Sequence, residues 1–256
     1  MKCKVMTFNL RVRAKIDGEN ILDNRKDKIL ELIRREAPDL IGFQEVGDDT
    51  LAWLKQSLSE YYVLGHGRYE NYHGEGTPIA YRRDRFDLHA FSEEWLSFAP
   101  QQAGSLLTGL DQSGCPRVCL CAELVPVEGE RPIAFFNMHT DHRGESARLV
   151  ECSLLVQKLQ ASAHPFVITG DFNALPDSPS IGVVLSTAEQ LGTVDATSGI
   201  PGSFHGFKGD VGNYKIDYVF TNLPTDPAAS YAIADDNACG VYYSDHNALC
   251  AFVEIG

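Results

Sequence analysis

Short apolar runs separated by polar turns dominate the chain, and most of them are too short to form buried helices. Several alternate apolar and polar residues or are rich in β-branched and aromatic residues, and Gly, Pro or charged residues separate them. This pattern is typical of β-strands bounded by turns. It predicts strands over residues 4–10, 40–43, 61–64, 78–81, 86–98, 118–127, 133–138, 166–169, 216–221 and 248–254.

Four other segments have helical signals. Residues 24–36 and 145–160 place apolar side chains three and four positions apart with charged residues opposite, which predicts two amphipathic helices. Asp48, Asp49 and Thr50 are capping residues in front of an apolar helical pattern, and Ser178 precedes a Pro that can open a short helix. Helices are therefore interspersed among a larger number of strands.

This order of elements predicts an α/β (α+β) fold in which two packed β-sheets are flanked by helices. The sequence contains no internal repeat and no linker long enough to separate two domains. We therefore expect one domain over residues 1–256.

Composition restricts the class of partner. Lys and Arg number 22 against 35 Asp and Glu, which gives a net charge of −13. Such a surface repels a nucleic-acid backbone at long range, so duplex DNA is a poor substrate candidate. A small or single-stranded phosphate ester held by local arginines remains compatible with this charge.

The apolar runs also bear on location. None approaches the roughly 20 residues that a membrane-spanning helix needs, and Thr7 and Asn9 interrupt the first one. We expect no membrane span, a cytoplasmic location and a monomer. The seven cysteines are scattered and mostly flanked by apolar residues, which favours reduced thiols over a metal site.

Polar residues with metal or phosphate chemistry stand at the ends of several predicted strands. A single Asn or Asp at a strand end is usually a turn or cap residue, and a single His is usually structural. The combination is more informative, because ends of neighbouring strands converge and would gather oxygen ligands around two imidazoles. These residues are Asn9, Glu45, His139, Asp171, Asn173, Asp217, Asp245 and His246.

The segments around these residues resemble, in order, the motifs of the endonuclease/exonuclease/phosphatase superfamily. A further set, including Asn9–Leu–Arg11 and Pro116–Arg117, is similar to a bacterial, deadenylase-like branch. The resemblance implies a deoxyribonuclease I-like four-layer sandwich with its site at one end of the two sheets. The superfamily segments are Thr7–Phe8–Asn9–Leu10, Gln44–Glu45, Asn137–Met138–His139–Thr140–Asp141–His142, Gly170–Asp171–Phe172–Asn173, Ile216–Asp217–Tyr218 and Ser244–Asp245–His246.

The chemistry of phosphate-ester hydrolysis, checked against the resemblance, suggests roles for these side chains. Asn9, Glu45 and Asp245 are candidate ligands of Mg²⁺, with Mn²⁺ as an alternative. Asp171 would deprotonate the attacking water and Asn173 would fix its geometry. Asp217 would orient His246 against the phosphoryl oxygens, and His139 would donate to a non-bridging oxygen.

Three residues are candidates for substrate binding. Arg117 and Arg148 could clamp a phosphate, although Arg148 fits a solvated helix face equally well. His205 lies in the Gly-rich loop Phe204–His205–Gly206–Phe207 before Asp217, where a base could stack, although a Phe in such a loop is as often involved in local packing. Two features depart from the family pattern: Cys119–Leu120–Cys121 stands where relatives tend to have an aromatic residue, and His205 stands where Asn is more usual.

Three classes of function fit these observations to different extents. An Mg²⁺-dependent phosphoesterase acting on a nucleotide, an RNA end or a small phosphate ester is the first. A phospholipid-directed hydrolase of the sphingomyelinase type is the second, but such an enzyme would normally show a signal-peptide pattern, an exposed apolar hairpin or a basic membrane face, and we expect none of these from this sequence. A catalytically silent binding module is the third, and it would be expected to lose the catalytic-type residues that this chain keeps.

Overall fold

Two six-stranded β-sheets form the centre of the molecule. The computed structural model describes residues 1–129, 131–210, 212–235, 237 and 240–256. The first sheet has the order β11 (Tyr231–Ile233), β12 (Ala248–Glu254), β1 (Lys2–Asn9), β2 (Leu40–Gln44), β4 (Ile79–Arg82) and β3 (Tyr61–Leu64). The second has the order β5 (Phe86–Trp95), β6 (Val118–Pro126), β7 (Ile133–His139), β8 (Phe166–Asp171), β10 (Asp217–Thr221) and β9 (Val194–Asp195).

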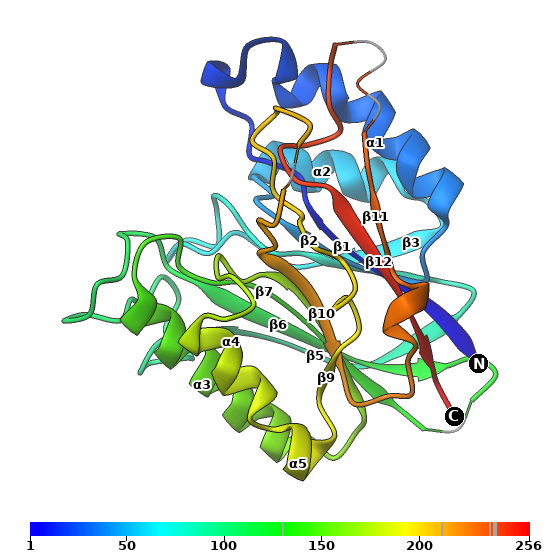
Figure 1. Cartoon of the computed structure of the whole chain (residues 1–256), viewed down its shortest axis with the longest axis vertical. Coiled ribbons are helices and arrows are strands. Elements are labelled where there is room, and N and C mark those ends of the chain that lie inside the picture. The colour runs from blue at the N-terminus through cyan, green and yellow to red at the C-terminus, as the bar shows by residue number, and fades with distance from the viewer. Residues whose placement is uncertain (130, 211, 236, 238–239) are drawn as a thin grey trace.

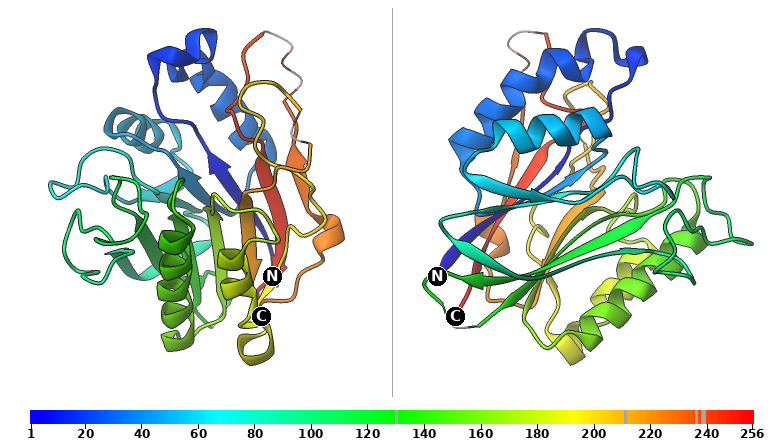
Figure 2. Two further views of the ribbon diagram at one scale, coloured as in Figure 1. Left: turned by 60° about the vertical axis from the view of Figure 1, so that its left-hand side comes forward. Right: turned by 180° about the vertical axis from the view of Figure 1, so that it is seen from behind.

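Helices cover the outer face of each sheet (Figures 1 and 2). α1 (Leu22–Glu36) and α2 (Asp48–Ser57) pack on the first sheet, and α3 (Glu145–Ala161) and α4 (Pro179–Leu185) pack on the second. Short helices η1 (Lys15–Asn20), α5 (Ala188–Leu191) and η2 (Pro227–Ala229) lie in the connections. The predicted sandwich of two packed sheets flanked by helices is confirmed.

Three apolar clusters hold these layers together. One fills the space between the sheets and contains Val5, Leu120 and Phe135. A second lies between the first sheet and α1 and α2, and a third lies between the second sheet and α3 and α4. Each strand near the middle of a sheet is thus buried on both faces, which explains why its sequence reads as a continuous apolar run.

The predicted elements differ from the structure mainly at short or edge segments. The prediction of a strand over 86–98 was too long, because the strand ends at Trp95 and a turn follows. Strands β9 and β11 have two and three residues and were not predicted. In the described part of the chain, no helix is both long and apolar enough to cross a membrane. Cys3, Cys115, Cys119, Cys121, Cys152 and Cys250 are free thiols, and Cys239 lies outside the described residues.

A buried polar link joins the two sheets below their common edge. The Asn137 side chain on β7 donates to the carbonyl oxygens of Phe43, Thr77 and Pro78, which belong to the first sheet or its loops. Its amide oxygen accepts from Gln44 Nε2 at 2.8 Å and from Thr169 Oγ1 at 3.0 Å. Because buried polar groups are costly unless paired, this network fixes one relative position of the sheets.

Gly42 on β2 leaves the space that this link occupies. A Cβ at position 42 would overlap Thr169 Oγ1 and Asn137 Oδ1. Gly42 is therefore required for close approach of the sheets rather than for a special backbone angle.

We expect Gly42→Ala to lower the free energy of unfolding by at least about 2 kcal/mol, because the new methyl group displaces buried hydrogen-bonding atoms. Chemical denaturation measures the change. Gly182→Ala is a matched control, since nothing lies within 4 Å of the Cβ that it would add. Equal stability of the two variants would show that the sheets tolerate a side chain at position 42.

Candidate active site

Strand register places the predicted catalytic residues in rows at one edge of the sheets. In the second sheet, His139 on β7 pairs with Asp171 on β8, and Asp171 pairs with Asp217 on β10. In the first sheet, Asn9 at the end of β1 pairs with Gln44, so that Glu45 follows directly. The Asn9 amide nitrogen donates to Asp171 Oδ2 at 2.9 Å and thereby connects the two rows.

Asp217, His246 and Asp171 form a compact group in the second row. Asp217 Oδ2 lies 2.8 Å from His246 Nδ1, and His246 Nε2 lies 3.7 Å from Asp171 Oδ2. All three residues are almost completely buried. The carboxylate of Asp217 therefore fixes the ring of His246, which directs its second nitrogen at Asp171.

The surroundings shift the pKa values of this group in a consistent way. Burial and the negative charge of Asp217 raise the pKa of Asp171 to about 7. Burial lowers the pKa of His246, but the carboxylates of Asp217, Asp171 and Asp245 outweigh it and raise the pKa to about 10. At neutral pH the imidazole of His246 is thus positively charged, while Asp171 can both take up and release a proton.

His139 and Asn173 form the other side of Asp171. Asn173 Nδ2 lies 2.9 Å from His139 Nε2 and also donates to the carbonyl oxygen of Thr140. Burial and the charges of Arg117 and Arg68 hold the pKa of His139 well below its usual value, so this imidazole is neutral. In this arrangement His139 Nε2 accepts a hydrogen bond, and its predicted role as a donor to substrate stays a prediction.

The first row contributes a second group of carboxylates. Glu45 Oε2 accepts from the Val12 amide at 3.0 Å, and Glu45 Oε1 accepts from Asn9 Nδ2 at 3.2 Å. The Arg11 guanidinium lies 3.8 Å from Glu45 and 3.7 Å from Asp245. Burial raises the pKa of Asp245, and the nearby charge of Glu45 raises it further. Two carboxylates that line the same cleft and whose charges act on each other are suitable ligands for a cation.

Asn9 faces this group with its nitrogen rather than its oxygen. Its amide oxygen accepts from the Arg11 backbone N–H at 2.9 Å, while its nitrogen serves Glu45 and Asp171. In this structure Asn9 therefore orients two carboxylates. Its predicted role as a metal ligand stays a prediction.

Three residues of the site have left-handed backbone angles that are unfavourable for residues with side chains. Arg11 has φ 55°, Glu45 has φ 57° and Asn173 has φ 47°. Each follows the end of a central strand and turns its side chain back toward the cleft. Such conformations persist only where the surrounding contacts enforce them, and they are concentrated at functional sites.

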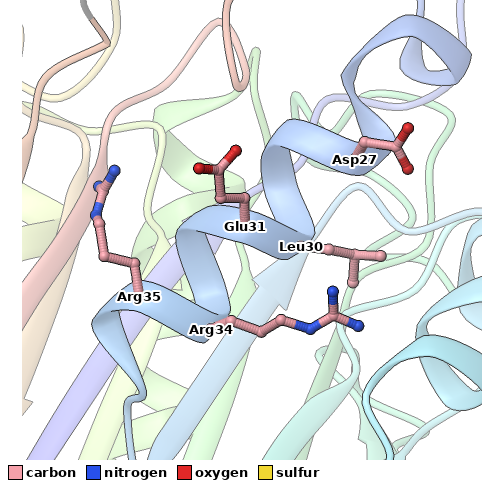
Figure 3. Close-up of a pocket in the computed structure, with 5 residues that line it drawn as sticks. All are labelled: Asp27, Leu30, Glu31, Arg34 and Arg35. Carbon is pink, nitrogen blue, oxygen red and sulfur yellow. The ribbon is translucent and has the colours of Figure 1, made fainter.

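Most of these groups line one cleft with a volume of about 380 Å³, whereas Asn9 and Asp217 are not among its lining residues and act through the residues that they contact. A hollow of about 510 Å³ on the outer side of α1 is larger than this cleft (Figure 3). It is lined by Asp27, Leu30, Glu31, Arg34 and Arg35, none of which is a predicted catalytic residue. The cleft at the sheet edge is therefore the candidate active site. Its lining residues include Arg11, Glu45, Arg68, Glu75, Arg117, His139, His142, Asp171, Asn173, Phe204, Tyr214, Asp245 and His246.

The family model of the endonuclease/exonuclease/phosphatase family matches residues 6–246, which include both rows of the site. The chain belongs to this family. Membership assigns the chain to the hydrolases of phosphate esters and confirms the family resemblance of the sequence motifs. A relative, the uncharacterized protein L388 of Acanthamoeba polyphaga mimivirus, is 27% identical over 158 residues, and the chain spans 59% of its length.

Solved structures of the family have the same fold. An endonuclease/exonuclease/phosphatase from Bacteroides vulgatus has a TM-score of 0.90 and 27% identity, with 100% of both chains covered. A mannosyl-6-phosphatase from Bacteroides thetaiotaomicron has a TM-score of 0.84 and 24% identity, with 98% of this chain and 100% of that chain covered. The catalytic domain of human Nocturnin has a TM-score of 0.74 and 21% identity, covering 100% and 95%.

The three predicted substrate-binding residues lie in different places. Arg117 lines the cleft, whereas Arg148 and His205 do not. Arg148 bonds to Glu145 and to the carbonyl oxygen of Asp141, which supports a structural role. His205 packs against Tyr242, and the preceding Phe204 lines the cleft instead, with its ring centroid 4.9 Å from that of His246.

Sequence reasoning missed Arg68, Glu75 and Tyr214, which also line the cleft. Arg68 and Glu75 stand in the loop between β3 and β4, outside every motif at a strand end. No periodicity marks such positions, because a loop side chain is directed by the course of the backbone and not by a regular repeat.

Two acidic groups in this family member could hold a metal ion. Asp171, Asp217 and His246 have ligand atoms within 4.8 Å of one another. However, a hydrogen bond between Asp217 and His246 accounts for their closeness. Glu45 and Asp245 offer hard carboxylate oxygens in the same cleft, and their donor chemistry fits Mg²⁺ better.

A buried carboxyl behind the cleft predicts a pH-dependent stability. Burial raises the pKa of Glu151 to about 7, and its oxygens accept from the Asp141 amide and from Gln112. Because the folded protein holds the Glu151 carboxyl in its neutral form, this group contributes fully to folding stability below the ordinary pKa of Glu. The contribution is lost as pH rises through the raised pKa of about 7.

We therefore expect wild-type stability to fall relative to Glu151→Gln between about pH 5 and pH 8, by roughly 3 kcal/mol. The Gln side chain keeps the volume and cannot ionise. Thermal denaturation across this range measures the difference, with Glu31→Gln on α1 as an exposed control. A difference that does not change with pH would contradict the assigned protonation state.

Proposed function

We propose that this protein is an Mg²⁺-dependent phosphoesterase that hydrolyses a phosphodiester or phosphomonoester by in-line attack of water. The observation that supports this most directly is the convergence of Asp171, the charged His246–Asp217 pair and the Glu45–Asp245 carboxylates on one cleft. Each of these groups has a distinct chemical task in such a reaction.

Asp171 is the proposed general base. Its pKa of about 7 suits proton uptake from water near neutral pH. Asn9 Nδ2 donates to Asp171 Oδ2 and the backbone N–H of Asn173 donates to Asp171 Oδ1, each at 2.9 Å. These two hydrogen bonds hold the carboxylate in one orientation. A water molecule positioned by Asp171 would attack without the cost of reorienting the base.

His246 is the proposed electrostatic partner of the phosphoryl group. Its positive charge, maintained by Asp217, lies beside Asp171 in the cleft. A preorganised cation at this position stabilises the negative charge that gathers on the phosphoryl oxygens in the transition state. Phe204 packs against the His246 ring and restricts its movement.

Glu45 and Asp245 are the proposed carboxylate ligands of Mg²⁺, with Mn²⁺ as an alternative. When bound, the metal would neutralise charge on the phosphate and on the leaving oxygen. Asn9 and the Val12 amide hold Glu45 in place, and Ser244 Oγ lies 3.2 Å from Asp245 Oδ1. Arg11 supplies a further positive charge between the two carboxylates.

The proposed substrate is a small or single-stranded phosphate ester such as a nucleotide, an RNA end or a sugar phosphate. The net charge of −13 disfavours a long duplex. A cleft of about 380 Å³ suits a small molecule or a chain end. Among proteins of the same fold are a mannosyl-6-phosphatase and Nocturnin. A single domain, a cytoplasmic location and a monomeric state stay predictions.

We expect Asp171→Asn and His246→Gln each to lower kcat for a generic aryl phosphate ester by at least ~10²-fold, because each removes a positioned acid–base or electrostatic group. Steady-state kinetics with p-nitrophenyl phosphate and bis(p-nitrophenyl) phosphate measure the loss. Asp27→Asn on the outer side of α1 is the matched control. Wild-type rates in either cleft variant would sink the assignment.

Chelation should abolish the activity, and Mg²⁺ or Mn²⁺ should restore it. Isothermal titration calorimetry of the metal-free protein with Mg²⁺ provides a readout independent of turnover. We expect Glu45→Gln and Asp245→Asn to weaken Mg²⁺ binding by ~10-fold or more, because each removes a charged ligand. If Asp171, Asp217 and His246 held the metal instead, Asp217→Asn would cause the larger loss of Mg²⁺ affinity.

A further inference from the structure

Two buried arginines line the active-site cleft from loops that carry none of the hydrolytic residues. Arg68 lies between β3 and β4, and Arg117 immediately precedes β6. Their exposed fractions are 6% and 2%. Burial of a guanidinium is costly, and the second positive charge adds to this cost, since burial and the charge of Arg68 both lower the pKa of Arg117.

The protein uses only part of the hydrogen-bonding capacity of this pair. Arg117 Nε and Nη1 and Arg68 Nε are buried and have no partner among the described residues. Arg117 Nη2 bonds to the exposed His142 at 3.0 Å, and Arg68 Nη2 bonds to Glu75 at 2.8 Å. Unsatisfied charged donors in a cleft indicate a missing anionic partner.

The carboxylate of Asp141 is close to Arg117 but does not satisfy its free donors. Asp141 Oδ2 lies 3.8 Å from Arg117 Nε. However, both Asp141 oxygens already accept other hydrogen bonds, Oδ2 from Ser113 and Oδ1 from the amides of Arg143 and Gly144. Asp141 therefore shapes its own loop, and its ion pair with Arg117 is too long to be a hydrogen bond to Arg117 Nε.

The arginine pair lies on the His139 side of the cleft, since the charges of both arginines lower the pKa of His139. In the described part of the chain, neither Arg68 nor Arg117 forms an ion pair with Asp171, Glu45 or Asp245. The carboxylates of that centre are instead compensated by His246 and Arg11. The unsatisfied donors of the arginine pair therefore remain for a further negative group in the same cleft.

We propose that Arg68 and Arg117 bind a second anionic group, a phosphate or a carboxylate, on a small phosphate ester whose scissile phosphate lies at Asp171 and His246. This inference rests on the proposed function and specifies its substrate class. A guanidinium pairs with either anion in two parallel hydrogen bonds. The entering anion takes the unsatisfied donors and replaces His142 as the partner of Arg117.

Calorimetry with matched sugar phosphates tests this assignment in an Asp171→Asn background, which prevents turnover in Mg²⁺ buffer. To test for a second phosphate, the affinity of fructose 1,6-bisphosphate is compared with that of fructose 6-phosphate. To test for a carboxylate, the affinity of 6-phosphogluconate is compared with that of glucose 6-phosphate. We expect at least one doubly anionic ligand to bind ~10-fold or more tightly than its partner, and Arg117→Gln and Arg68→Gln to remove this advantage.

Arg34→Gln, on the outer side of α1 (Figure 3), is the control and should keep the full advantage. Circular dichroism and thermal denaturation show whether each variant folds, and Arg117→Lys serves as a milder substitution. Equal affinities within both ligand pairs, or an advantage that survives in folded Arg117→Gln and Arg68→Gln, would overturn the proposal. The wild-type assay with aryl phosphates reports separately on the proposed function.

Discussion

The buried Asn137 amide determines how the two halves of the active site meet. Each half depends on register within one sheet, but among the described residues no strand ladder connects the two sheets. Asn137 makes that connection by bonding to carbonyl oxygens of the first sheet and to Gln44 and Thr169. A methyl group at Gly42 would displace these atoms, so the sheets need a glycine at this position to pack this closely. The Asn9–Asp171 contact lies at the edge of the sheets next to this link.

Charge compensation explains why so many ionisable groups can be buried around one cleft. His246 lies among three carboxylates, and Arg11 lies near Asp17, Glu45 and Asp245. Arg25 is fully buried and donates to the carbonyl oxygens of Leu10, Arg11, Asn20 and Tyr243. It thereby fastens the loop of Arg11 to the segment before Asp245, and removing it would release both sides of the proposed metal site.

The parts of this structure that could be predicted from sequence are those that repeat with a period. Apolar runs identified the central strands, and strand ends carried the residues that register later brought together, such as His139 and Asp171. Edge strands of two or three residues have too few positions to show a pattern. The directions of loop side chains are set by tertiary contacts, which is why Arg68 was missed and why Phe204, rather than His205, lines the cleft.

Residues at strand ends and residues on loops also differ in the task that we assign to them: the first hydrolyse the substrate and the second select it. The residues that we assign to hydrolysis lie at the ends of central strands, where packing between the sheets fixes them, and these positions carry the family motifs. Arg68 and Arg117 lie on connections between strands, which change length or residue more readily than the strands do. Motifs can therefore identify a phosphoesterase while leaving its substrate open, and the substrate has to be inferred from the loops. In this chain the loops present two buried cations with unsatisfied donors, and that favours a substrate with more than one negative group.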